Sequence, residues 1–167
     1  MAELNGKPFP PGEYPAVVVG SGPGAIQVGY SLGRLGVDHA IVSEDEQPGG
    51  MFRRFPLFQR LITWTKPHAP AERGTRPYEW YDWNSLIGEQ DDHRALVPSF
   101  MDGVSYFPSR EEMERGLVAF ADRGGVRVRY GCRWEATRRD GDAGFVLTTT
   151  DGEYRCRALV IAVGMTE

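Results

Sequence analysis

The sequence is poor in cysteine: its 167 residues include only two, Cys132 and Cys156. These two do not show the CxxC spacing of a zinc site or of a redox-active dithiol pair. So few cysteines also exclude a disulfide framework, and this favours a reducing compartment. We therefore expect no metal site and a location in the cytoplasm.

Long apolar runs are lacking as well. No stretch approaches the roughly 20 apolar residues that a membrane-spanning helix needs. The first fifteen residues, MAELNGKPFPPGEYP, contain no apolar segment of the signal-peptide type. We expect a soluble protein with no membrane partner.

An excess of positive charge is the third feature that the chain lacks. Its 19 lysines and arginines stand against 23 acidic residues, for a net charge of −4. The arginines are scattered in pairs, such as Arg53-Arg54 and Arg138-Arg139, and do not form a block. Because nucleic-acid binding requires a basic surface, we expect no nucleic-acid partner.

The sequence does have glycine, concentrated directly after a short apolar run in AVVVGSGPGAIQVGYSLGRLGVDHAIVSE, residues 16–44. The β-branched run at 16–19 predicts a buried parallel strand, with a helix as the alternative because the run has only four residues. Apolar positions from Pro23 onward predict a helix that stops at Gly36, and the run at 40–42 predicts a second strand. Residues 16–45 therefore form a predicted βαβ unit, the building block of a parallel sheet.

The flanking segments are less regular. Residues 1–15 predict an extended leader. Residues 46–107 are rich in proline and aromatic residues and carry little periodicity. Because such a long irregular stretch inside a domain usually serves a function, we expect residues 46–107 to wrap around a ligand. Residues 108–167 predict a helix, a small β-meander and a closing strand.

Local signals place the elements of this last segment. Ser109 and Glu112 have the spacing of a capping box, so a helix is expected to begin there. VRVRY, residues 126–130, alternates with the period of a strand. Turn signals predict an antiparallel meander over 132–157, and ALVIAVG predicts a buried strand within 158–164. The predicted fold class is α/β, a parallel sheet with a small antiparallel meander.

The glycine turn matches a dinucleotide fingerprint. Gly20, Gly22 and Ala25 fit the pattern G-x-G-x-x-G/A. The first glycine permits the turn, the second lets a pyrophosphate approach the backbone, and the small third residue allows close packing of helix and strand. The start of the helix adds free N–H groups and a partial positive charge. A purely structural turn is the alternative.

An acidic residue after the second strand completes the fingerprint by accepting hydrogen bonds from a ribose. Glu44 lies near the expected spacing of roughly 20 residues from the glycines. Asp45 and Glu46 follow it directly, and a solvated acidic turn is the alternative for all three. We assign the role to Glu44. NAD and FAD both use this fingerprint, so the pattern alone does not separate them.

Four motifs in order resemble the two-dinucleotide-domain flavoproteins, in particular the flavin-containing and N-hydroxylating monooxygenases. The motifs are VVVGSGPGAIQVGYSL, EDEQPGGMF, YFPSREEMERGLVAFADRGGVRVRYGCRWEA and YRCRALVIAVG. The resemblance covers nearly the entire chain. It implies that residues 1–167 are a partial, Rossmann-like FAD-binding domain, because members of this family carry a second fingerprint for NADPH that is not found here.

The resemblance also implies which residues contact FAD, although it implies no acid–base catalyst and no metal ligand. The implied contacts are the pyrophosphate turn Gly20, Gly22, Pro23, Gly24 and Ala25, the ribose acid Glu44, the flavin neighbours Gly50, Met51, Phe52 and Trp64, the adenine neighbour Trp134, and Gly164 in the closing motif.

The sequence departs from the family at two places. Thr63-Trp64 stands where the family brings Thr-Asn close to the reactive edge of the flavin, so Trp64 either stacks on the ring or is a core aromatic. This departure concerns the oxygenating chemistry rather than FAD binding. Aligned without a gap, Ser43 falls at the family's ribose glutamate, and a bulge of one residue would move Glu44 there.

The predicted function is that of an FAD-dependent oxidoreductase of monooxygenase type, acting on a small-molecule substrate. NADPH or NADH bound elsewhere would reduce the flavin. Because a partial domain exposes a sheet edge, we expect self-association or a partner chain that completes the fold. Two alternatives remain open: a non-catalytic FAD- or dinucleotide-binding subunit, and an NAD(P)-dependent dehydrogenase.

Overall fold

A computed structural model of the chain describes residues 6–54, 59–63, 71–72, 75, 77 and 82–164. The chain forms two compact units: Met1–Gln47 with Val126–Glu167, and Pro48–Gly125. The elements, in chain order, are β1 (Gly12–Val19), α1 (Pro23–Arg34), β2 (His39–Val42), α2 (Met51–Arg54), the 3-10 helices η1 (Asp91–His93) and η2 (Val97–Phe100), α4 (Arg110–Arg123), β3 (Trp134–Arg139), the 3-10 helix η3 (Gly141–Ala143), β4 (Phe145–Thr149) and β5 (Gly152–Ile161).

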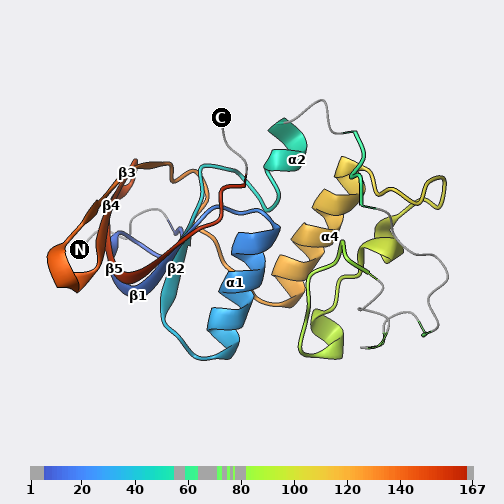
Figure 1. The fold of residues 1–167 in the computed structure, drawn as a ribbon, viewed down its shortest axis with the longest axis horizontal. Helices are drawn as coiled ribbons and strands as arrows, with labels where there is room; N and C mark the ends of the chain where they lie inside the picture. The colour runs from blue at the N-terminus through green and yellow to red at the C-terminus, as the bar shows by residue number, and fades with distance from the viewer. Residues whose placement is uncertain are drawn as a thin grey trace. The chain divides into compact units, whose positions relative to one another are not determined.

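One five-stranded sheet, in the order β2-β1-β5-β4-β3, organises the first unit. β1 pairs in parallel with β2 and with β5, whereas β4 pairs antiparallel with β5 and β3. In Figure 1 the blue β1 and the red β5 lie side by side although most of the chain separates them. The predicted α/β class, with a parallel part and an antiparallel meander, is confirmed.

The apolar character of β1 follows from burial on both faces of the sheet. Val17 and Val19 join a core cluster with Leu147 and Tyr154 of the meander. Val18 points to the opposite face, because side chains alternate along a strand. Its partner in β2 is Ile41, which packs against Gly29 of α1. Both faces of the strand are thus covered, and all three valines are at most 3% exposed.

β1 begins at Gly12, so the last residues of the predicted extended leader belong to the first strand. Pro15 lacks the N–H that a sheet ladder uses, and proline is rare in the interior of a sheet. The register explains the exception. β2 pairs with β1 only from Ala16 onward, so within the described residues one side of the segment 12–15 is an edge, where proline is tolerated.

The predicted strand at 126–130 was also wrong. Only Arg129 forms a bridge there, in parallel with Val42 of β2. The Arg129 N–H donates to the Ile41 carbonyl at 2.8 Å, and the Ser43 N–H donates to the Arg129 carbonyl at 3.0 Å. Arg129 therefore adds a single parallel bridge to β2 and does not form a further strand.

The last strand is longer than predicted. The third strand of the meander and the run at 158–164 are joined in a single strand, β5. The predicted burial of that run was wrong, because Ala158 is exposed and Ile161 is 55% exposed. The cause lies in the pairing. β1 follows nearly the whole of β5, but within the described chain β4 pairs only with residues 152–156.

The second unit has its own small core, in which Phe52, Val97, Met113 and Leu117 are buried together. Its longest helix, α4, begins at the predicted capping box. The Glu112 N–H donates to Ser109 Oγ, and the Glu112 carboxylate accepts the Ser109 N–H. This prediction is confirmed.

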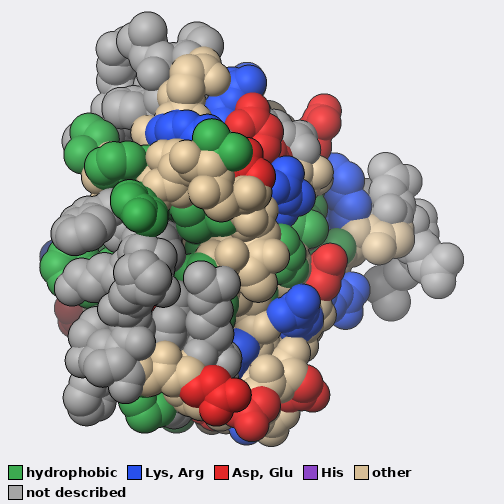
Figure 2. Space-filling model, turned by 90° about the vertical axis from the view of Figure 1, so that its right-hand side faces the viewer, with side chains coloured by type: hydrophobic (Ala, Val, Ile, Leu, Met, Phe, Trp, Pro, Cys, Tyr) green, Lys and Arg blue, Asp and Glu red, His purple; other side chains and the backbone are tan. Residues whose placement is uncertain are grey.

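Charge is mixed on the surface seen in Figure 2, where described basic and acidic side chains lie interleaved. Among the described residues, no three His, Cys, Asp or Glu side chains are grouped as metal ligands would be. No helix in the described part of the chain has the length and apolar character required to cross a bilayer.

Candidate functional site

The turn between β1 and α1 contains a glycine that the fold itself requires. Gly20 has a φ of +121°, a conformation that L-residues rarely adopt. A Cβ at this position would lie 2.9 Å from the carbonyl carbon of Ala162, in the segment after β5. The Gly20 N–H also donates to the Val42 carbonyl at 2.9 Å. Gly20 thus lets β1, β2 and the end of β5 meet at one point.

Gly22 differs from Gly20 both in its backbone conformation and in the space around it. Its φ of −76° and ψ of −177° suit any residue, and no atom of the described residues lies within 4 Å of a Cβ placed there. The part of the fold that the structure describes therefore does not require glycine at position 22. A group from outside the chain that approaches the backbone closely would require it, because a side chain would fill the space next to the first turn of α1.

The start of α1 has the chemistry of an anion site. Gly22 is the N-cap and provides no side-chain cap, Pro23 occupies the first turn, and no acidic residue lies in that turn. The N–H groups of Gly24 and Ala25 therefore lack intrahelical partners, as at any helix start. Together with the positive end of the helix dipole, they favour a bound phosphate. The open space at Gly22 fits the diphosphate of a dinucleotide.

Small residues bring α1 close to the sheet. Ala25 is fully buried, and a Cβ at Gly24 would lie 3.8 Å from the Ala162 Cβ. Gly29, one turn further on, lies against Ile41 so closely that a Cβ would overlap the end of that side chain. We did not predict Gly29 as a packing position. Its spacing of four residues from Ala25, on the same helix face, was the available signal.

The closing motif lies at the same turn. The Ala162 N–H donates to the Val19 carbonyl at 2.9 Å, directly before Gly20. Gly164 follows two residues later, exposed and with a φ of +74°. The fold thus brings the end of the described chain next to the fingerprint, as the resemblance implied. A contact between Gly164 and a pyrophosphate stays a prediction.

The acidic segment after β2 presents its side chains in different directions. Glu44, the residue that we assigned to the ribose, is exposed. Asp45 is half-buried, and its Oδ2 accepts a hydrogen bond from Ser21 Oγ at 2.7 Å. Ser43 Oγ lies 3.2 Å from the same oxygen and 3.1 Å from Ser21 Oγ. Sequence reasoning missed this cluster, because three consecutive acids give no indication of which one turns toward the glycines.

The flavin neighbours implied by the resemblance belong to the second unit. Gly50 is buried, Met51 is 39% exposed, and the Phe52 side chain packs into the core of that unit. Trp64 lies outside the described residues. The assignment of all four to the flavin stays a prediction.

Trp134, the implied adenine neighbour, opens β3 in the first unit. Its Nε1 donates to Thr137 Oγ1 at 2.8 Å, and its ring packs against the core cluster of that unit. β3 and β2 form opposite ends of the strand order, so Trp134 and the acidic segment come from different ends of the sheet. The adenine contact stays a prediction.

The two cysteines are free thiols in the interior. Cys132 donates to Thr149 Oγ1 at 3.3 Å. Burial raises the pKa of the Cys156 thiol, which keeps it protonated at neutral pH. Because the thiolate is the reactive form, Cys156 is a poor nucleophile in the folded chain.

Comparisons with known proteins agree with this geometry. Residues 17–166 match the family model described as pyridine nucleotide-disulphide oxidoreductase. The mouse protein named FAD-dependent oxidoreductase domain-containing protein 2 is 34% identical over 158 residues, which cover 89% of this chain. Its counterpart in Danio rerio is 32% identical over 155 residues. The chain spans 23% and 21% of the lengths of these two relatives.

Solved structures with a similar fold include a flavin-containing monooxygenase from Stenotrophomonas maltophilia, at a TM-score of 0.65 and 20% identity. The match covers 90% of this chain and 38% of that one. The bacillithiol disulfide reductase Bdr from Staphylococcus aureus has a TM-score of 0.66 at 18% identity, covering 91% of this chain and 38% of its own. At these identities, the likeness concerns the fold.

Proposed function

The chain belongs to the pyridine nucleotide-disulphide oxidoreductase family, and from this premise we propose that it is the FAD-binding part of an FAD-dependent oxidoreductase. The two curated relatives are named as FAD-dependent oxidoreductase domain proteins. The cofactor of the fingerprint is thus FAD rather than NAD(P), which makes a simple dehydrogenase the weaker alternative.

The observation that carries this proposal is the contrast between Gly20 and Gly22. Gly20 is explained by the fold, since a side chain there would overlap Ala162. Gly22 has no such explanation among the described residues, because none of them lies within 4 Å of a Cβ placed there. A ligand whose phosphate lies against the backbone supplies the missing reason.

The chain's own residues would bind and orient the cofactor. The first-turn N–H groups of Gly24 and Ala25 donate to the diphosphate, with Pro23 fixing the first helical residue. The acidic segment at 44–46 receives the adenosine ribose, and the closing motif with Gly164 borders the diphosphate. Gly50, Met51, Phe52, Trp64 and Trp134 are proposed neighbours of the flavin and adenine. FAD, when bound, supplies the electron-accepting ring that this chain lacks.

We propose a reaction of monooxygenase type on a small molecule, with NADPH or NADH bound outside this chain as the reductant. The support is the set of motifs shared with flavin-containing monooxygenases and the similar fold of one such enzyme. The chain spans about a quarter of the length of its curated relatives, so the reaction of a whole protein is a proposal. The cytoplasmic location is a proposal as well. So is the division of the chain into a leader, a βαβ unit, a wrapping segment and a closing segment.

Absorption spectroscopy of the purified chain tests the proposal. We expect a yellow protein with a flavin band after reconstitution with FAD and removal of free cofactor. A protein that retains no flavin would overturn FAD binding. If flavin is retained, NADPH added without oxygen separates the remaining alternatives. Bleaching of the flavin band would indicate that the flavin of this chain accepts hydride from NADPH without any further domain. A flavin band that persists fits an FAD-binding part whose reductant site lies elsewhere.

A further inference from the structure

We propose that Asp45, and not Glu44, recognises the adenosine ribose, and that Ser21 and Ser43 position its carboxylate. The site would then select a dinucleotide with a free ribose 2′-hydroxyl and reject a 2′-phosphate. This inference rests on the proposed function and adds the identity and the selectivity of the ribose contact.

The backbone fixes the direction in which Asp45 points. The Ser43 N–H donates to the Arg129 carbonyl at 3.0 Å, and the Cys132 N–H donates to the Ser43 carbonyl at 2.8 Å. The Asp45 carbonyl accepts the Gly131 N–H at 2.9 Å. Residues 129–132 thus hold both ends of the segment 43–45 and leave Glu44 exposed between them.

The side chains then form a compact cluster. Ser21 and Ser43 are 1% and 5% exposed, and both hydroxyls lie within 3.2 Å of Asp45 Oδ2. The Asp45 N–H also donates to Ser43 Oγ at 3.2 Å. Both serine bonds go to Oδ2, and a carboxylate has about four lone-pair positions over its two oxygens. The serines restrict the carboxylate to one orientation.

The position of Ser21 connects this cluster to the phosphate site. Ser21 directly precedes Gly22, the residue beside which we place the diphosphate. In a dinucleotide the adenosine ribose is attached directly to that diphosphate. A carboxylate that is hydrogen-bonded to Ser21 is therefore close to the place that the ribose would take.

Selectivity follows from charge. A carboxylate accepts hydrogen bonds from the 2′- and 3′-hydroxyls of a ribose. It repels a 2′-phosphate at the same place, because two negative groups at contact distance are unfavourable in a partly buried site. The site thus fits the adenosine half of FAD and disfavours that of NADPH.

The test measures the affinity of the 167-residue chain for FAD, ADP-ribose and 2′-phospho-ADP-ribose by titration calorimetry. We expect Asp45→Asn to weaken FAD binding about tenfold or more, and to weaken it at least tenfold more than Glu44→Gln does. The wild-type chain should prefer ADP-ribose over its 2′-phosphate, and Asp45→Asn should narrow that preference. Asp142→Asn, an exposed acid in η3, is the matched control and should leave all affinities unchanged.

The outcomes are distinguishable. A wild-type chain that binds no FAD overturns the proposed function and this inference together. FAD binding that survives Asp45→Asn, or that is lost in Glu44→Gln, overturns the inference alone. Ser21→Ala is the second variant: with Asp45 intact, it should weaken FAD binding less than Asp45→Asn but still narrow the preference for ADP-ribose. Circular dichroism confirms that each variant is folded.

Discussion

At the level of single residues, two glycines in one turn are glycines for different reasons. Gly20 has a backbone conformation and a neighbour, Ala162, that both exclude a side chain. Gly22 has an ordinary backbone conformation and no such neighbour among the described residues. We propose that the diphosphate of the cofactor requires glycine there. The glycine pattern could be predicted from the sequence, but these separate causes could not, because Ala162 comes from the far end of the chain. The orientation of Asp45 could not be predicted for the same reason, because it depends on residues 129–132, which are distant in the sequence.

Replacement of Gly20 tests the structural half of this difference. We predict that Gly20→Ala lowers the free energy of unfolding by about 3 kcal/mol, through backbone strain and overlap with Ala162. Gly36→Ala is the matched control. Gly36 also has a positive φ, of +68°, but none of the described residues lies within 4 Å of its Cβ position, so we expect only the backbone strain of about 1 kcal/mol. Urea unfolding measures both variants. If they lose the same free energy of unfolding, the predicted overlap with Ala162 is contradicted.

At the level of elements, local signals succeeded and long-range pairings did not. α4 could be predicted because its capping box lies within four consecutive residues, Ser109 to Glu112. The strand expected at 126–130 and the burial expected at 158–164 both failed. In each case the structure depends on which strand lies alongside. Residues 126–130 form a single bridge, to Val42, and the run at 158–164 is partly exposed because its pairing with β4 ends early.

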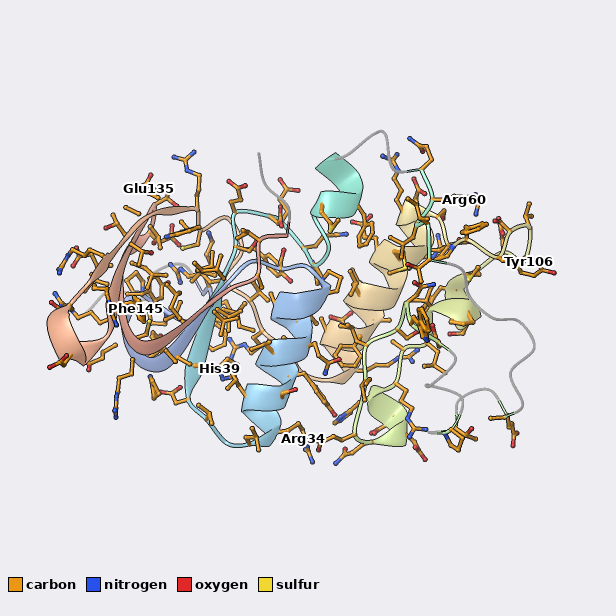
Figure 3. All side chains as sticks on the ribbon, viewed as in Figure 1. Arg34, His39, Arg60, Tyr106, Glu135 and Phe145 are labelled. Atoms are coloured by element: carbon orange, nitrogen blue, oxygen red, sulfur yellow. The ribbon has the colours of Figure 1, made fainter. Side chains whose placement is uncertain are left out.

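Glu112 does more than cap α4. Its two carboxylate oxygens accept the N–H groups of Ser109 at 2.7 Å and Asp102 at 2.8 Å, and the side chain is almost fully buried. Arg60 lies near the same end of α4, with its Nη1 4.0 Å from the carboxylate (Figure 3). Glu112 therefore ties the loop before α4 to the start of the helix.

We predict that Glu112→Ala destabilises the chain by about 2 kcal/mol, because the backbone N–H groups of Ser109 and Asp102 both lose a charged acceptor. Glu112→Gln should recover part of this loss, since glutamine also serves in a capping box. Glu111→Ala is the control in the same turn. Glu111 is exposed, so its replacement should change stability by no more than about 0.5 kcal/mol. Thermal unfolding followed by circular dichroism measures all three, and a Glu111 variant as unstable as the Glu112 variant would contradict the assignment.

At the level of the whole molecule, the sheet has a partly unpaired strand in its interior. Residues 158–161 of β5 pair with β1, but in the described chain β4 has already ended beside Cys156. Unpaired strand edges with apolar side chains associate with other strands. We therefore propose that the chain self-associates through this segment.

Size-exclusion chromatography with light scattering tests this proposal. We expect the wild-type chain to elute above its monomer mass of 18.6 kDa and Ile161→Lys to shift it toward the monomer. Leu35→Lys removes an equally apolar side chain, 76% exposed at the end of α1, and should leave the mass unchanged. A wild-type chain that is monomeric at micromolar concentration would disprove the association.

The most direct measurement is the affinity for FAD of a Gly22→Asp variant. Aspartate is a favoured N-cap residue, so this change should keep or raise the stability of α1. The same carboxylate would occupy the first-turn N–H groups and repel the diphosphate. Gly33→Ala, on the exposed part of the same helix, is the control and should bind FAD as the wild type does. We predict a folded Gly22→Asp protein that has lost FAD binding by at least a hundredfold; a folded variant that binds FAD as tightly as the wild type would contradict the proposed site.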